Sequence, residues 1–203
     1  MDDAEPPLTR AGARLLDVAG ELFYREGINT VGVARVAEVA GVTKKTLYDC
    51  FGSKDALVTR YLQQRHRRWW NHLEHRLRTA TAPRALALFD AYFDHPELNT
   101  SRGCAFLNAA AELPPDHPAL DVIRHHKTAV RQRLADLVAE TTTDPTLAET
   151  LFLALEGATA QLALDDHDHT AAARQLAAAH LDGLRTGGGH PEGGDQPYDE
   201  SSA

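Results

Sequence analysis

The stretch at residues 33–54, VARVAEVAGVTKKTLYDCFGSK, constrains the fold of this chain more than any other stretch. Ala37 is small enough to let a second helix cross close against the first, and Gly41 can adopt the positive φ that a sharp turn between helices needs. Thr43 follows where an N-cap belongs, with its hydroxyl free to accept from a backbone amide. The order and spacing of these residues predict a helix-turn-helix.

Each helix of this stretch has one apolar face, and the residues left outside on the second helix are mostly polar. The apolar faces consist of Val33, Val36, Ala37 and Ala40, then Val42, Leu47, Cys50 and Phe51. A short helix with a buried apolar side and an outer side of Lys, Thr and Tyr suits the major groove of DNA. A solvated face is the alternative, but the surrounding motif favours DNA. The residues expected to contact DNA are Arg35, Thr43, Lys44, Lys45, Thr46, Tyr48 and Lys54.

From about residue 9 to residue 62 the chain resembles the TetR family of transcriptional regulators. The runs that carry the resemblance are AGELFYREGINTVGV and VAEVAGVTKKTLYDCFGSKDALV. The later run RGCAFLNAAAELPPDHPAL resembles a segment found in a subset of these regulators. The resemblance implies a three-helix DNA-binding domain followed by a larger helical domain that dimerises and usually binds a small molecule.

The sequence departs from the family pattern at two positions of the second helix. These positions are commonly aromatic or histidine in the family, and several such residues touch phosphate. Here they are Asp49 and Cys50. An acid that faced phosphates would repel them, so the departure affects the expected contacts with DNA rather than the fold.

The net charge of −8 argues against a nucleic-acid partner, but the charge is unevenly distributed. Residues 1–80 carry 13 Lys/Arg and 10 Asp/Glu, whereas residues 81–203 carry 8 and 19. Such asymmetry is a hint of an interaction surface. The positive part coincides with the helix-turn-helix, which supports an interaction with DNA there.

Composition also restricts the compartment in which the chain is expected. The two cysteines, Cys50 and Cys104, are too few for a disulfide framework, so a reducing compartment is the default. The acidic start is unlike a signal peptide, and no apolar run approaches the roughly 18 residues of a membrane span. We therefore expect a cytoplasmic protein without a membrane partner.

The remaining sequence predicts helices throughout, with no strand pattern and no repeat. We expect a long helix at residues 54–79, followed by helices near 84–94, 104–113, 118–140, 146–164 and 171–185. The predicted organisation is all-α: a disordered arm (1–8), a helix-turn-helix DNA-binding domain (9–56), a helical effector-binding and dimerisation domain (57–186) and a disordered tail (187–203). The arm and the tail offer few apolar side chains to bury.

Aromatic residues of the central helices, together with a few polar ones, could form an apolar ligand pocket. Each aromatic taken singly is better explained as a core residue, and the family resemblance is the main support for a pocket. The candidate ligand-binding residues are Trp69, Phe89, Tyr92, Phe93, Phe106, Asn108, Glu112 and His126.

No cofactor and no metal site are predicted. Residues 165–170, DDHDHT, place two histidines among three acids, which are ordinary zinc ligands, but an acidic loop explains them without metal. His125 and His126 are adjacent, so they face different directions on a helix. Cys104 is interpreted as a small core residue rather than a nucleophile.

We therefore expect a sequence-specific transcriptional regulator rather than an enzyme, and repression is the usual role in the family that it resembles. The expected partners are a near-palindromic double-stranded operator, a small-molecule effector and a second copy of the chain bound through the two C-terminal helices. The alternative is a helical small-molecule-binding protein or enzyme that uses the central pocket. The lack of a catalytic dyad, metal-ligand spacing or phosphate loop argues against an enzyme.

Overall fold

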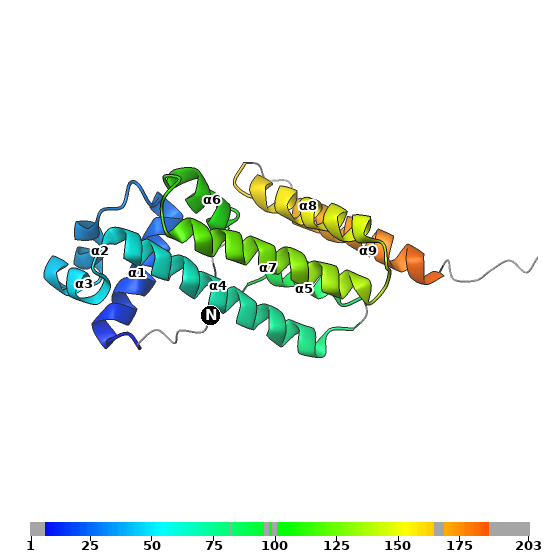
Figure 1. Ribbon diagram of the computed structural model, residues 1–203, viewed down its shortest axis with the longest axis horizontal. Coiled ribbons are helices and arrows are strands. Elements are labelled where there is room, and N and C mark those ends of the chain that lie inside the picture. Colours follow the sequence, from blue (N-terminus) through cyan, green and yellow to red (C-terminus); the bar gives the residue numbers. More distant parts are fainter. Residues whose placement is uncertain (1–6, 82, 96–97, 99–100, 165–168, 187–203) are drawn as a thin grey trace, which may run out of the picture.

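The computed structural model describes residues 7–81, 83–95, 98, 101–164 and 169–186, and every regular element within them is an α-helix. The all-α fold class is therefore confirmed. The helices are α1 (Arg10–Glu26), α2 (Val33–Val39), α3 (Lys44–Phe51), α4 (Lys54–Thr79), α5 (Ala85–Phe93), α6 (Ala105–Glu112), α7 (Ala119–Ala139), α8 (Pro145–Gln161) and α9 (His169–Thr186). In Figure 1, α1, α2 and α3 gather at one end of the molecule, and α4, α7, α8 and α9 run along its long axis.

Local sequence signals set the start and end of the helices at the N-terminal end. The hydroxyls of Thr9, Thr43 and Ser53 each accept a hydrogen bond from a backbone amide in the first turn of α1, α3 and α4 respectively. Gly41 has a φ of 66° and makes the turn between α2 and α3. These caps and this turn confirm the predicted helix-turn-helix geometry.

The N-terminal end has an apolar core that α4 shares with α1, α2 and α3. Leu15, Leu47 and Leu57 lie at its centre and are fully buried. Residues from α6 and α7, including Phe106 and Ile123, also belong to this cluster. The N-terminal core is therefore built from α1–α4 together with parts of α6 and α7.

A second apolar core lies toward the other end of the molecule and brings together α4, α5, α7, α8 and α9. Trp69, Leu73 and Leu77 supply the α4 side of this core. The single helix α4 therefore spans both cores and connects them (Figure 1).

The predicted helix bounds differ by a few residues from those in the structure. The last helix begins at His169, two residues before the expected start, which is within the usual variation of helix ends. Leu8, at the end of the predicted arm, is half-buried against the N-terminal core. Residues 1–6 of the arm and the predicted tail, 187–203, lie outside the described residues.

Among the helices that the structure describes, none has the length and apolar composition that crossing a membrane requires.

The segment before α6 approaches α8 very closely at Gly103. This glycine has a φ of 70°, and a Cβ placed on it would lie 2.4 Å from the carbonyl oxygen of Thr159. A side chain would therefore be strained by the backbone conformation and would also collide with the α8 backbone. Glycine allows the chain to lie against α8 here, and this contact forms part of the site described below.

Replacing Gly103 by alanine should destabilise the fold by more than the same replacement at Gly52. Gly52 has a φ of 75°, but a Cβ placed on it would meet nothing within 4 Å, so Gly52→Ala should lower the free energy of unfolding by about 1 kcal/mol. Gly103→Ala should cost about 1–3 kcal/mol more, because α8 must shift. Urea unfolding of both variants measures the difference, and equal losses would show that the close approach to Thr159 is unimportant.

Candidate DNA-binding surface and ligand cavity

Helix α3 has one buried side and one open side. Leu47 and Phe51 pack into the N-terminal core, whereas Lys44, Lys45 and Tyr48 are exposed. Tyr48 keeps 48% of its surface accessible, so its phenol can reach a partner outside the chain. The open side of α3 therefore carries the cations and the phenol that were predicted to contact DNA.

Neighbouring side chains on this open side bond to one another. The hydroxyls of Thr43 and Thr46 are 2.9 Å apart, and Lys45 Nζ donates to Asp49 Oδ2 at 2.7 Å. The Lys45–Asp49 pair is highly exposed, and exposed pairs of this kind contribute only about 0–1 kcal/mol. Breaking the Lys45–Asp49 ion pair therefore costs little free energy, so Lys45 is available to bind a phosphate.

Arg35 and Lys54, the two other predicted DNA contacts, both bind elements near the turn between α1 and α2. The Arg35 guanidinium lies 3.3 Å from Glu26, and Arg35 remains exposed. Lys54 Nζ donates to the carbonyl oxygen of Ile28 at 2.6 Å. Lys54 thus holds the linker between α1 and α2, and its ammonium has two further donors for other partners.

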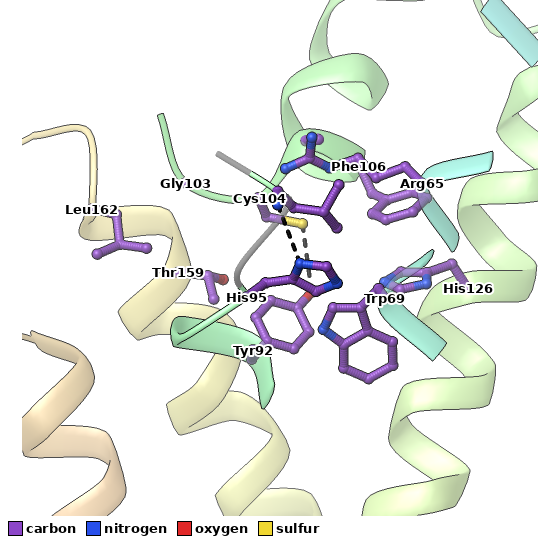
Figure 2. A pocket seen from close by; sticks show the side chains of 12 residues that line it. Arg65, Trp69, Tyr92, His95, Gly103, Cys104, Phe106, His126, Thr159 and Leu162 are labelled. Atoms are coloured by element: carbon purple, nitrogen blue, oxygen red, sulfur yellow. Dashed lines mark hydrogen bonds between the residues drawn. The ribbon is translucent and has the colours of Figure 1, made fainter. Parts of the chain in front are cut away.

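A small cavity lies among the central helices, close to where the two apolar cores meet (Figure 2). It encloses about 30 Å³, which is room for about one water molecule. The residues that line it are Arg65, Trp69, Tyr92, His95, Leu98, Gly103, Cys104, Ala105, Phe106, His126, Thr159 and Leu162. Four of the predicted ligand-binding residues, Trp69, Tyr92, Phe106 and His126, are therefore brought together around one space.

The other four predicted ligand-binding residues lie elsewhere. Phe89 is fully buried in the second core, and Phe93 is half-buried against the same core. The remaining two are hydrogen-bonded to the backbone. Asn108 Nδ2 donates to the carbonyl oxygen of Arg102, in the segment before α6. A Glu112 carboxylate oxygen accepts from the backbone amide of Asn29, in the linker after α1. None of the four lines the cavity.

Most residues of the cavity wall were not predicted from the sequence. One missed residue, Arg65, lies one helical turn before Trp69, so helical spacing could have found it. Gly103 and Cys104 come from the segment before α6, and Thr159 comes from α8. No local pattern identifies these three residues, because their position depends on how that segment packs against α8.

A half-buried ion pair lies behind the wall formed by Tyr92 and Cys104. Lys127 Nζ is 2.6 Å from Glu156, and it also donates to Tyr92 Oη at 3.0 Å and to Cys104 Sγ at 3.3 Å. Burial raises the pKa of Tyr92 well above its ordinary value, and the neighbouring Cys104 and Glu156 raise it further. Tyr92 therefore stays a neutral phenol that accepts from Lys127.

His126 of α7 lines the cavity, and His66 of α4 contacts His126. His126 stacks on Phe106 with ring centroids 3.7 Å apart, and its Nδ1 lies 2.9 Å from Nδ1 of His66. Burial lowers the pKa of His126 well below its ordinary value, and Lys127, His66, His125 and Arg65 add to the effect. The pKa of His66 is lowered by burial, then by His125 and Arg67.

Hydrogen bonds tie the cavity wall to α1. Tyr24 Oη donates to the carbonyl oxygen of Gly103 at 2.9 Å and accepts from the backbone amide of Arg102 at 2.8 Å. The Arg102 guanidinium donates to the carbonyl oxygen of Tyr24 at 2.7 Å. The segment that closes the cavity is therefore bonded directly to the first helix of the helix-turn-helix unit.

The run of acids and histidines that could have formed a metal site falls at residues 165–170, of which 165–168 lie outside the described residues. Elsewhere, in the part of the chain that the structure places, no cluster of three His, Cys, Asp or Glu side chains could hold a metal ion.

Known proteins resemble the chain both in sequence and in fold. Residues 15–61 match the model of the family described as bacterial regulatory proteins, tetR family. The crystal structure of a TetR-family transcriptional regulator from Streptomyces coelicolor is 30% identical, with a TM-score of 0.76, and the match covers 88% of this chain and 96% of that one.

Curated relatives match over shorter stretches. An uncharacterized HTH-type transcriptional regulator from Mycobacterium tuberculosis is 38% identical over 58 residues, which span 29% of each chain. The HTH-type transcriptional activator FasR from Mycolicibacterium smegmatis is 33% identical over 93 residues, 45% of this chain and 42% of that protein. The chain therefore matches less than half the length of these two relatives.

The lowered pKa values of His66 and His126 predict a stability that depends on pH. The unfolded chain, in which histidine has its ordinary pKa of about 6.5, takes up protons more readily than the folded chain. The free energy of unfolding should therefore be fully retained above about pH 6.5 and should fall as the pH drops below it. The slope is at most about 1.4 kcal/mol per pH unit for each proton taken up.

Urea unfolding at several pH values between 7.5 and 5 (a range of about 2.5 units around the ordinary histidine pKa) tests this expectation. His126→Gln should flatten the dependence. The matched control, His180→Gln, changes an exposed histidine of α9 and should leave the dependence as it is. An unchanged slope in His126→Gln would contradict the assignment.

Proposed function

The chain belongs to the TetR family of transcriptional regulators, and from that premise we propose that it is a repressor which a small-molecule effector releases from its operator. The observation that carries the DNA-binding part is the open side of α3, with two exposed lysines and an exposed tyrosine on a helix-turn-helix scaffold. Activation is the second candidate, because one relative, FasR, is named an activator. A reporter gene behind the operator, with and without this protein, distinguishes the two.

We assign base and phosphate contacts to α3. Lys44, Lys45 and Thr46 occupy its first turn, where side chains reach base edges and phosphates, and Tyr48 can donate to a phosphate oxygen. Thr43 caps this helix, and Arg35 and Lys54 flank it. Asp49 lies beside Lys45 and reduces the positive charge of the surface.

We propose that two copies of the chain pair through α8 and α9 about a two-fold axis. These helices pack against each other along one side of the molecule (Figure 1), and large apolar side chains remain open on them. Leu153 is 61% exposed and Leu176 is 40% exposed. A two-fold dimer would read a near-palindrome whose half-sites are centred one helical turn, about 34–36 Å, or a multiple of it apart.

The cavity is our candidate for the effector site, and two structural paths connect it with α3. Trp69 belongs to α4, whose first residue, Lys54, holds the linker between α1 and α2. Gly103 and Arg102 are bonded to Tyr24 of α1. A ligand that enlarges so small a cavity must move one of these walls, so it favours one arrangement of the helix-turn-helix over another.

Lys44→Ala and Lys45→Ala should each weaken binding to DNA that flanks the protein's own gene. Removing one lysine–phosphate interaction should reduce the slope of log affinity against log salt by about one unit. Tyr48→Phe should weaken binding because the phenolic hydroxyl is removed, and Asp49→His should strengthen it if position 49 faces a phosphate. Gel-shift titrations at several salt concentrations measure all four effects.

Arg78→Ala is the matched control, because it removes one exposed positive charge from the far end of α4. It should change affinity little at physiological salt. Wild-type affinity in the Lys44→Ala, Lys45→Ala double variant would refute α3 as the recognition helix. No retention of any flanking DNA by the wild type would favour the alternative of a helical small-molecule-binding protein.

Leu153→Glu should dissociate the proposed dimer, because it places a charge in an apolar interface. Light scattering should give twice the 22.2 kDa chain mass for the wild type and the chain mass itself for the variant. Leu107→Glu changes a leucine of α6 with 37% exposure and should leave the dimer intact. A monomeric wild type at micromolar concentration would refute the proposed assembly.

A further inference from the structure

The indole nitrogen of Trp69 is a buried hydrogen-bond donor without an acceptor in the part of the chain that the structure describes. Trp69 is 5% exposed and lines the cavity. In Figure 2 the nitrogen-bearing edge of the ring faces Tyr92 and His95, across the cavity. Buried polar atoms nearly always have a partner, so this donor calls for an explanation.

The polar atoms of the two residues that this edge faces are already engaged. His95 Nε2 lies 3.3 Å from the carbonyl oxygen of Arg68, and His95 Nδ1 accepts from the amide of Leu98 at 3.1 Å. Tyr92 Oη accepts from Lys127. The walls thus present aromatic rings to the space beside the indole N–H, and a molecule in that space would have to supply the acceptor.

The charges around the cavity favour a neutral molecule. The positive charge of Lys127 is balanced by Glu156, and the lowered pKa of His126 keeps that ring neutral at pH 7. Arg65 stacks over the ring of Tyr24, with its guanidinium carbon 4.5 Å from the ring centroid. A cation in the cavity would be repelled by the Arg65 guanidinium, and an aromatic enclosure desolvates any net charge.

The geometry also limits the size and shape of the molecule. Phe106 and His126 are stacked, and Trp69 meets Tyr92 at an interplanar angle of 66°. These flat walls suit a flat, compact guest, and because the cavity has room for about one water molecule, such a guest must displace one of the walls. A wider polar groove of about 490 Å³ borders the cavity, and Arg65 and Leu98 line both spaces. These two residues form the shared wall through which a guest can enter.

We propose that the cavity binds a compact, uncharged, planar compound with a carbonyl group, whose oxygen accepts a hydrogen bond from Trp69 Nε1–H. The aromatic or unsaturated part of the compound lies against Tyr92 and Phe106. This proposal rests on the proposed effector site and names the class of ligand that it takes. Ligand binding is measured without DNA, so its outcome is independent of the assignment of α3.

Acetophenone and α-methylstyrene are a suitable pair of probes, since they have nearly the same shape and only the first has a carbonyl oxygen. The full-length protein is labelled with ¹⁵N in its two tryptophans, Trp69 and Trp70, and the two indole N–H signals are followed by NMR during titration. Acetophenone should shift the Trp69 signal and bind roughly 3- to 10-fold more tightly than α-methylstyrene, as one net hydrogen bond would give.

Two tryptophan variants serve as test and control, and they also assign the two signals. Trp69→Phe keeps an aromatic ring but removes the donor, so it should abolish the preference for acetophenone. Trp70→Phe changes the neighbouring, half-buried tryptophan, which does not line the cavity, and should retain the preference.

Each other outcome has a definite meaning. Equal affinity for the two probes in the wild type would leave an apolar ligand site but overturn the carbonyl class. A preference that survives in Trp69→Phe would overturn the role of the indole. If neither probe moves the Trp69 signal at saturating concentration, the donor serves a bound water and the proposal fails, while the DNA-binding assignment of α3 stands or falls by its own test.

Discussion

The contact between the Gly103 backbone and the Thr159 carbonyl is the constraint on which the centre of this molecule depends. Because no side chain separates the two backbones, the segment before α6 can lie against α8 and still reach α1. Tyr24 of α1 binds this segment from the other side through its hydroxyl. One short piece of chain therefore fixes α1, α8 and a wall of the cavity relative to one another.

This arrangement changes how the two parts of the molecule can communicate. Helix α4 takes part in both apolar cores and is the covalent route between them. The hydrogen bonds of Tyr24 supply a second, non-covalent route that starts at the cavity wall. Coupling between two sites typically amounts to about 1–3 kcal/mol, which the loss or rearrangement of one or two buried hydrogen bonds could supply.

Local structure was largely predictable from the sequence, and the cavity was predictable only in part. The caps at Thr9, Thr43 and Ser53, the turn at Gly41 and both ends of α4 follow from residue type and helical spacing. The aromatic cavity residues were found because they combine apolar character with a central position in the chain. The loop residues were not, because their place depends on tertiary packing that no spacing rule describes.

The polar residues show why sequence could not separate a ligand site from a structural contact. Asn108 and Glu112 were expected in the pocket, yet Asn108 binds the Arg102 carbonyl just before α6. Glu112 binds Asn29 and so joins α6 to the N-terminal end. A polar side chain among apolar neighbours has the same sequence signature in both situations.

The structure distinguishes a ligand site from a structural contact by showing which partner each polar group binds. Asn108 and Glu112 have protein partners, so their role in holding α6 is accounted for within the chain itself. The indole N–H of Trp69 has no hydrogen-bond acceptor in the part of the chain that is described. From the sequence, Trp69 taken singly could be explained as a core residue. An unsatisfied donor in an aromatic enclosure is therefore a stronger guide to ligand chemistry here than the number of polar residues near the pocket.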